Sequence, residues 1–312
     1  MTQGIILPPG VSIAIIAFLL SLLPASLFMW LWYLRRTDRS VAASSVALAF
    51  LLGLGLVPLA FFAEQYAAQT WQNLSPATFL YFSGSALPLQ SLKDVGLAAL
   101  GTFGIVAVIE EGLRYVVLRV WLTRSRVVDQ VFDGLVIGIA MGIGFATLEN
   151  TIYFWQQLQA GQLDTLVFIF FLRFLISTLA HISFGGLMGT LLTRGVFSLY
   201  NPRRYLLLAF WLPWCMHGLY DLFLSLEMSS YAILLLLPAL IVLIAWAQRR
   251  EFFIIHRKDG RLLVFQEAPQ RHQAQAVRQF LKQFESPWNT YAPWLNERRK
   301  RGQLLDEISE PS

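Results

Sequence analysis

Seven long apolar runs, separated by short polar segments, restrict this chain to very few folds. They lie at 11–34, 41–63, 95–121, 131–155, 164–193, 205–226 and 230–248. A helix rises about 1.5 Å per residue, so each run is long enough to cross roughly 30 Å of hydrocarbon. Hydrophobic residues make up 56% of the chain and charged residues only 14%. We therefore expect an all-α protein, a polytopic transmembrane helical bundle of about seven spans.

Basic residues gather in every second polar segment. They are Arg35, Arg36 and Arg39, then Arg124 and Arg126, then Arg194, Arg203 and Arg204, and finally Arg249 and Arg250. The alternate segments 64–94 and 156–163 contain only one basic residue, Lys93. The positive-inside rule then predicts a multi-pass protein of the cell membrane with the N-terminus outside and the C-terminus cytoplasmic. Because no basic stripe lies along a soluble face, we expect the lipid bilayer as a partner and no nucleic acid.

The chain divides into a membrane part and a soluble part. Residues 1–248 are expected to form a transmembrane domain, with its functional core at about 95–226, and residues 249–312 are expected to form a soluble cytoplasmic tail. Segment 64–94 is predicted to be a loop that lies on the outer interface or covers a site. In the tail we expect a hairpin of 251–257 and 261–266 around Lys258-Asp259-Gly260, and helices at 271–285 and 293–308.

Six acidic or histidine side chains lie towards the middle of the apolar runs. They are Glu110, Glu111, Glu149, His181, His217 and Asp221. An ionisable group in hydrocarbon costs at least a few kcal/mol, so it usually marks a functional site with polar partners on neighbouring helices. Their positions along the runs bring the six groups, on four helices, into one slab of the membrane. Arg173 and Ser177 precede His181 at four-residue intervals, which predicts one polar helix face.

Two further patterns concern helix packing and charge balance. Arg114 follows Glu110 by four residues and can pair with it, while Glu111, about 100° around the helix, is expected to point elsewhere. One glutamate would then be structural and the other catalytic. Arg114 and Arg173 are expected to balance the acids. The glycines that recur every four residues predict close approach of a neighbouring helix; they are Gly134, Gly138 and Gly142.

Histidines and carboxylates together in a membrane cavity suit hydrolysis. A carboxylate can take a proton from water, while imidazoles or a bound divalent metal stabilise the oxyanion. If a metal is present, it is expected to be zinc, held by His181 and His217 with Glu149 or Asp221. Glu110 or Glu111 would then be the base. The HExxH pattern is absent, so such a site would be assembled from separate helices.

Four segments together resemble the PrsW family of intramembrane proteases, which is related to the CAAX prenyl endopeptidases and bacteriocin-immunity membrane proteins. These segments are Glu110-Glu111-Gly-Leu-Arg114, Phe132-Asp133-Gly134 through Phe145-Ala-Thr-Leu-Glu149-Asn150, His181, and His217-Gly-Leu-Tyr-Asp221. The resemblance covers about 100–225 and implies a metalloprotease or glutamate-dependent protease. By position, it implies catalytic roles for Glu110, Glu111, Glu149, His181, His217 and Asp221. Arg114, Asn150 and Arg173 are expected to support them. The first member of the family cleaves a membrane-anchored anti-sigma factor.

We therefore expect an intramembrane endopeptidase that uses glutamate-activated water on a membrane-anchored protein. Such a site needs water and an unfolded substrate segment, which predicts a lateral or outward opening near Glu149 and Asp221. The alternatives are a proton- or ion-coupled transporter and a non-catalytic binding or immunity protein with the same fold. The sequence leaves open the substrate, the presence of a metal, the choice between Glu110 and Glu111, the oligomeric state and the role of the tail.

Overall fold

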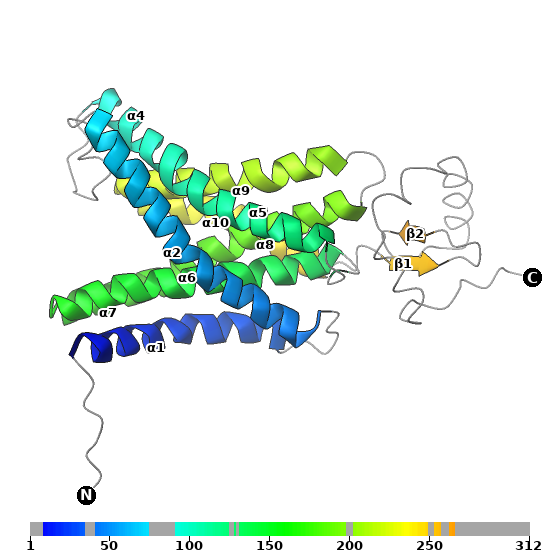
Figure 1. Ribbon diagram of the computed structural model, residues 1–312, viewed down its shortest axis with the longest axis horizontal. Coiled ribbons are helices and arrows are strands. Elements are labelled where there is room, and N and C mark those ends of the chain that lie inside the picture. Colours follow the sequence, from blue (N-terminus) through cyan, green and yellow to red (C-terminus); the bar gives the residue numbers. More distant parts are fainter. Residues whose placement is uncertain are drawn as a thin grey trace, which may run out of the picture.

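The computed structural model describes residues 9–34, 41–74, 91–124, 128, 131–197, 202–248, 253–256 and 262–265. Its helical elements are α1 (Pro9–Met29), η1 (Trp30–Leu34), α2 (Ala43–Leu74), α4 (Leu92–Gly101), η2 (Thr102–Ala107), α5 (Val108–Arg124), α6 (Val131–Gln159), α7 (Leu163–Leu172), η3 (Arg173–Ser177), α8 (Thr178–Phe197), α9 (Pro202–Ser225) and α10 (Ser229–Gln248). The three η elements are π-helical turns. Two of them join flanking helices, so that α4–η2–α5 and α7–η3–α8 are continuous (Figure 1).

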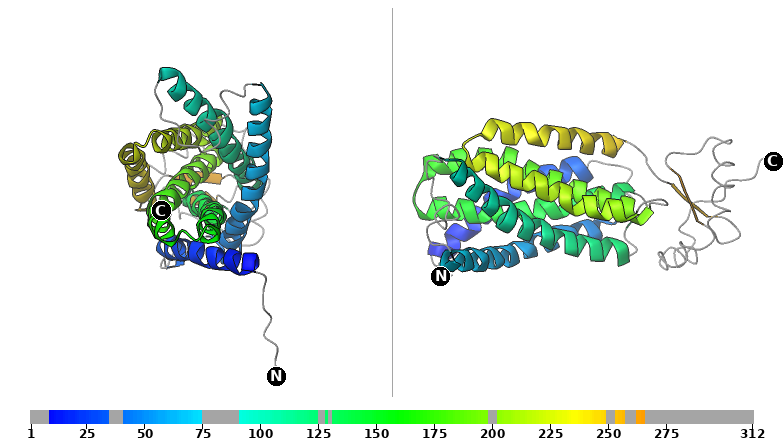
Figure 2. Two further views of the ribbon diagram at one scale, coloured as in Figure 1. Left: turned by 90° about the vertical axis from the view of Figure 1, so that its left-hand side faces the viewer. Right: turned by 90° about the horizontal axis from the view of Figure 1, so that it is seen from above.

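The predicted polytopic bundle is confirmed, with one difference in the number of full-length spans. Six helical stretches are long and apolar enough to cross a membrane: Gly10–Leu34, Ala43–Asn73, Leu92–Leu122, Val131–Gln159, Leu163–Val196 and Arg203–Ser225. The seventh predicted run is also helical, but its apolar part, Ser229–Ala245, is shorter than the other six. This helix, α10, packs against α9 at the side of the bundle (Figure 2).

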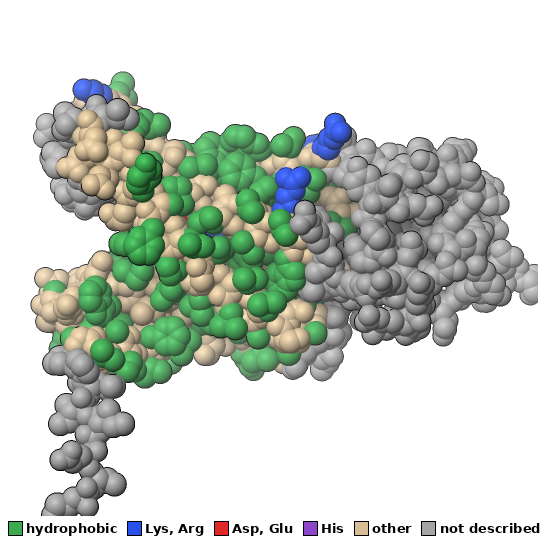
Figure 3. Space-filling view, viewed as in Figure 1, with side chains coloured by type: hydrophobic (Ala, Val, Ile, Leu, Met, Phe, Trp, Pro, Cys, Tyr) green, Lys and Arg blue, Asp and Glu red, His purple; other side chains and the backbone are tan. Residues whose placement is uncertain are grey.

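Helix α6 is the centre of the bundle, and large apolar side chains cover much of the outside. Along α6 most side chains are buried, whereas Phe62, Phe168 and Ile241 elsewhere are 65–70% exposed. Figure 3 shows apolar side chains over the outer face of the bundle, as expected for a surface in contact with lipid. Helices α1, α2 and α8 pack around α6.

The predicted close helix approach occurs between α6 and α8. A Cβ atom on Gly138 would meet the carbonyl oxygen of Gly185, and one on Gly142 would meet that of His181. Across α6, a Cβ on Gly144 would meet the backbone of Phe50 in α2. These contacts bring backbones together without intervening side chains. They also fix the position of the second half of α6, which ends in the acidic motif.

The prediction of a loop over 64–94 is wrong at both ends. Helix α2 continues to Leu74, because residues 64–73 contain helix-forming alanine and glutamine and no proline. Helix α4 begins at Leu92, where Ser91 and Asp94 form a capping box with bonds of 2.9 and 3.3 Å. Residues 75–90 lie outside the described part of the chain. Glu64 is therefore a helical residue.

The tail contains the predicted hairpin strands. Strand β1 (Phe253–His256) pairs antiparallel with β2 (Leu262–Phe265), with Phe253 opposite Phe265. The helices predicted at 271–285 and 293–308 lie outside the described residues. The domain boundary at 248 stays a prediction.

Candidate active site

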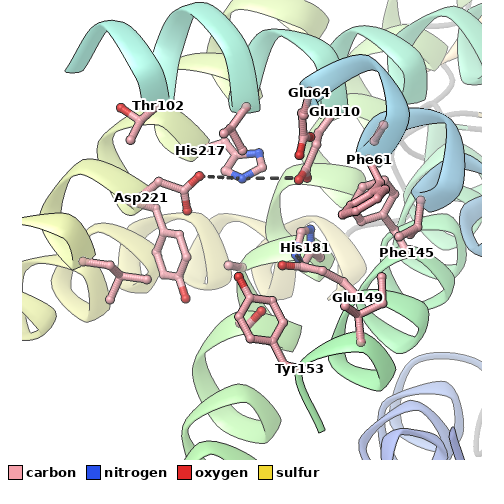
Figure 4. Close-up of a pocket in the computed structure, with 18 of the residues that line it drawn as sticks. Phe61, Glu64, Thr102, Glu110, Phe145, Glu149, Tyr153, His181, His217 and Asp221 are labelled. Carbon is pink, nitrogen blue, oxygen red and sulfur yellow. Dashed lines mark hydrogen bonds and ion pairs between the residues drawn. The ribbon is translucent and has the colours of Figure 1, made fainter. Parts of the chain in front are cut away.

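Helices α6 and α9 end at the same end of the bundle (Figure 1). A cavity of about 510 Å³ opens there. It is lined from α2, α4, η2, α5, α6, η3, α8 and α9. Five of the six predicted site residues line it: Glu110, Glu149, His181, His217 and Asp221. Figure 4 shows their side chains converging from separate helices. The sixth, Glu111, lies behind the cavity wall and is completely buried.

Helix α5 supplies a buried charge cluster of two glutamates and one arginine. The Nη2 atom of Arg114 lies 3.1 Å from Oε2 of Glu110 and 2.7 Å from Oε1 of Glu111. The expectation that Glu111 points away from Arg114 is therefore wrong. A long arginine side chain reaches back over one helical turn, where residues three and four positions earlier are both neighbours. Arg114 also lies over the ring of Phe145, 4.5 Å from its centroid.

His217 is held between carboxylates on both of its nitrogens. Its Nδ1 lies 2.8 Å from Oε1 of Glu111, and since a carboxylate only accepts, Nδ1 donates this hydrogen bond. Its Nε2 faces the cavity, 3.2 Å from Oδ2 of Asp221 and 3.9 Å from Oε2 of Glu110 (Figure 4). The ring of Phe184 stacks on the imidazole, with 5.1 Å between the two ring centroids. The ring orientation is thus fixed by Glu111 behind it and Phe184 beside it.

Glu149 belongs to a second cluster, on α6, η3 and α8. Its Oε1 lies 2.7 Å from Nη2 of Arg173, and its Oε2 lies 2.6 Å from Nε2 of His181. Arg173 donates from Nε to Oδ1 of Asn150 at 2.6 Å, and Asn150 donates to Oγ1 of Thr178 at 3.2 Å. The guanidinium also lies 3.8 Å from the ring centroid of Tyr153. Arg173 and Asn150 therefore position Glu149.

The π-helical turn η3 sets the geometry of this second cluster. The amide of Thr178 donates to the carbonyl of Arg173, five residues back. Such turns are frequent at functional sites because they redirect side chains within a helix. Here the predicted polar face is present, since Arg173, Ser177 and His181 all line the cavity.

The two clusters meet through aromatic contacts. Phe145 lies between Arg114 and His181, with its ring centroid 5.3 Å from that of His181. The imidazoles of His181 and His217 are 5.8 Å apart by their centroids. The side chains of Glu149 and Asp221 are 22% and 24% exposed, so the cavity is accessible from their side. In Figure 3 the outline is hollowed at this end, between the α2–α4 and α6–α7 pairs.

One acidic residue of the cavity, Glu64, was missed from the sequence. It lies on α2 with Phe61 and Gln65 in the cavity wall, and Figure 4 shows it beside Glu110. Its Oε1 atom is buried and has no hydrogen-bond partner among the described residues. A signal was present: Val57, Phe61 and Glu64 follow helical spacing, so the stripe continues beyond the end of the apolar run at residue 63.

The predicted zinc shell of His181, His217, Glu149 and Asp221 is not assembled in this arrangement. Both oxygens of Glu149 are engaged by Arg173 and His181, and a guanidinium at 2.7 Å occupies the place of a cation. Among the residues that the structure describes, no group of three or more His, Cys, Asp or Glu side chains is arranged to hold a metal ion. The donors therefore do not fit a metal as they are placed, and the zinc expected from the sequence has to be tested by measurement.

Comparison with known proteins places residues 41–247 in a defined family. This segment matches the family model described as PrsW family intramembrane metalloprotease. The match begins well before residue 100, and so includes α2 and Glu64. No solved structure matches the chain significantly.

Three curated relatives, each named Protease PrsW, are similar to this chain. The protein from Geobacillus kaustophilus is 29% identical over 199 residues, which cover 60% of this chain and 83% of the relative. The protein from Halalkalibacterium halodurans is 25% identical over 207 residues, covering 64% and 92%. The protein from Clostridioides difficile is 28% identical over 144 residues, covering 46% of this chain and 58% of the relative.

Proposed function

Since this chain belongs to the PrsW family of intramembrane proteases, we propose that it is an endopeptidase that hydrolyses a peptide bond of a membrane-anchored protein. The chain is a multi-pass membrane protein, with six helices long enough to span. One observation carries the proposal: four helices bring two histidines and three carboxylates to one accessible cavity. An anti-sigma-factor-like protein is the substrate class that the family resemblance implies.

Glu110 is the residue that we assign as general base. It lines the cavity, whereas Glu111 is buried behind the wall. The ion pair with Arg114 compensates the negative charge of Glu110, whose side chain is only 9% exposed. Its carboxylate takes a proton from water while the water oxygen attacks the scissile carbonyl carbon.

His217 is the residue that we assign to the leaving group. Its Nε2 faces the same part of the cavity as Glu110, and its Nδ1 donates to Glu111. A proton given from Nε2 to the amide nitrogen allows the C–N bond to break, and the proton taken up by Glu110 then restores His217. Glu111 acts as a positioning residue because it fixes the ring from behind.

The wall of α6, η3 and α8 is assigned to the oxyanion. Arg173 and His181 both line the cavity, and the guanidinium of Arg173 carries a positive charge. Glu149 orients both through bonds of 2.7 and 2.6 Å. Donors that are held in place before the reaction stabilise developing negative charge without reorganisation.

Substrate is proposed to enter from the outer side of the membrane. The exposed Arg203 and Arg204 begin α9 at the end of the bundle opposite the cavity, where the positive-inside rule predicts cytoplasm (Figure 1). This supports an outside N-terminus, a cytoplasmic C-terminus and an outward cavity. A substrate helix hides its carbonyls, so the segment cut must be unwound.

The packing below the cavity does not favour the transporter alternative. A transporter requires a polar path that continues to the other side of the membrane. Here the α6–α8 interface below the site closes through direct backbone contact at Gly134, Gly138, Gly185 and Gly189. The other alternative, a non-catalytic binding or immunity protein, predicts no peptide cleavage and is tested by the following experiment.

The test uses the full-length protein in liposomes with fluorescently labelled, membrane-anchored peptides. We expect the wild type to cleave at least one peptide and Glu110→Gln to lose this cleavage. Glu227→Gln is the matched control, because it removes an equal charge at an exposed turn between α9 and α10, outside the cavity. Unchanged cleavage by Glu110→Gln would contradict the proposed function, and so would a wild type that cleaves none of the peptides.

A further inference from the structure

We propose that Glu64 forms a subsite that binds a basic side chain, lysine or arginine, next to the scissile bond of the substrate. The inference rests on the proposed protease function and specifies which substrates it accepts. Glu64 lies on α2, which supplies none of the residues assigned to the chemistry above. Its role is therefore one of selection.

The length and register of α2 bring Glu64 to the cavity. The helix has 32 residues, or about 48 Å at 1.5 Å per residue, which exceeds the thickness of the hydrocarbon. Val57, Ala60, Phe61 and Glu64 face the same way at helical spacing, and all four line the cavity. The extra turns of α2 thus form one wall of the opening.

Glu64 differs from the other acids of the cavity in its pairing. Glu110 has Arg114, Glu149 has Arg173 and His181, and Asp221 has His217, each within 3.2 Å. In the part of the chain that the structure describes, Oε1 of Glu64 is buried without a hydrogen-bond partner. A buried carboxylate oxygen without a donor is unfavourable, so a donor supplied by a bound molecule stabilises the complex.

The charge balance of the site favours a cation as that donor. The described cavity and the wall behind it contain five carboxylates, listed here: Glu64, Glu110, Glu111, Glu149 and Asp221. Two guanidinium groups, Arg114 and Arg173, and two imidazoles, His181 and His217, oppose them. With all five carboxylates ionised and both imidazoles charged, the site keeps one negative charge. A neutral donor would leave this charge in place, whereas an ammonium or guanidinium group removes it.

The surroundings of Glu64 also suit the stem of a basic residue. Phe61 lies one helical turn before Glu64, lines the same wall and is 45% exposed. Lysine and arginine pack their methylene groups on apolar surface while the charged end remains at a polar group. The side chain of Phe61 can thus contact the stem while Glu64 pairs with the head group.

The experiment compares two membrane-anchored peptides that differ only in the side-chain amine. One peptide of each pair carries lysine and the other carries norleucine at the same position. A separate pair is made for each of the three positions on either side of the scissile bond. We expect the wild type in liposomes to prefer lysine over norleucine at one position by at least tenfold in kcat/KM. Glu64→Gln should reduce this ratio to below threefold, and Glu64→Lys should make glutamate the preferred residue there.

The control variant is Glu227→Gln, which should keep the wild-type ratio because Glu227 does not line the cavity. Equal cleavage of lysine and norleucine peptides by the wild type, or an unchanged preference in Glu64→Gln, would overturn the inference and leave the protease function intact. If the wild type cleaves neither peptide, the proposed function is overturned.

In that case the affinity of the protein for the peptides, measured by microscale thermophoresis, tests the subsite directly. Equal affinity of wild type and Glu64→Gln for the lysine peptide would overturn the proposed subsite.

Discussion

Glu110 and Glu111 are adjacent in the sequence, but their surroundings give them different tasks. Glu110 faces the cavity, while Glu111 is completely buried between Arg114 and His217. We expect Glu110→Gln to lower kcat at least a hundredfold, because the base is lost. We expect Glu111→Gln to lower activity about tenfold to a hundredfold, because one buried charge-assisted bond of His217 is weakened.

We expect Glu111→Gln to lower the free energy of unfolding more than Glu110→Gln does, although Glu110→Gln should lower activity more. Glu111→Gln leaves Arg114 with one carboxylate in a fully buried position, and breaking a buried ion pair costs about 3–5 kcal/mol. Glu110→Gln changes a group at the cavity surface and should lower the free energy of unfolding less. Peptide cleavage and denaturant titration of both purified proteins check this. A larger loss of activity in Glu111→Gln would assign the base to Glu111.

Metal content tests the donors of the site. Because Arg173 and His181 occupy both oxygens of Glu149, we expect less than about one-tenth zinc per purified chain. Elemental mass spectrometry of the wild type beside His181→Ala and His217→Ala measures this. Zinc near one per chain that is lost in both variants would instead confirm the predicted shell, and would require Arg173 to leave Glu149.

Most of the site could be predicted because an ionisable residue inside an apolar run can be recognised from the sequence alone. Glu149, His181 and His217 are such residues, and the structure brings them together. Glu64 was missed because it follows its apolar run and hydropathy alone does not show where the helix ends. The pairing of Arg114 with both glutamates depends on a side-chain rotamer, which sequence spacing does not determine.

At the level of helices, the α6–α8 contact supports the site from below. A Cβ atom on Gly138 would meet the backbone of Gly185, which no side-chain movement relieves. We expect Gly138→Ala to lower the free energy of unfolding by about 1–3 kcal/mol, as overpacking does in tightly packed interiors. It should also lower activity, because His181 lies on α8, which would be displaced.

The control is Gly55→Ala in α2, where a Cβ atom meets nothing within 4 Å. Alanine favours a helix over glycine by about 1 kcal/mol, so this variant should be as stable as the wild type or more so. Unfolding titrations in one detergent compare the two proteins. Equal stability of Gly138→Ala and Gly55→Ala would mean that the α6–α8 contact is not tight.

The helix count was predictable but the helix ends were less so. Apolar runs gave the number and order of the helices, and the four-residue glycine interval indicated the α6–α8 contact. The ends of α2 and α4 were missed because polar residues continue α2 as a helix to Leu74. The π-helical turns could not be predicted from the apolar pattern, since their hydrogen bonds depend on how neighbouring helices pack.

At the scale of the whole molecule, the arginines at the start of α9 and the cavity lie at opposite ends of the bundle. The turn between α6 and α7, which includes Gln162, lies at the cavity end, whereas Arg203 and Arg204 begin α9 at the other end (Figure 1). Cytoplasmic segments retain basic residues, so the cavity should open outward. If so, a substrate must present its cleavage segment near the outer leaflet.

Cysteine labelling in intact cells tests this orientation. Cys215 is the one cysteine of the chain, so a Cys215→Ser background leaves no other thiol in the protein. We expect Gln162→Cys, which is exposed in the wild type, to react with a membrane-impermeant maleimide in intact cells. Ser312→Cys at the C-terminus should react only after the cells are lysed. The reverse result would turn the cavity towards the cytoplasm, and the substrate segment would then have to be delivered from the inner leaflet.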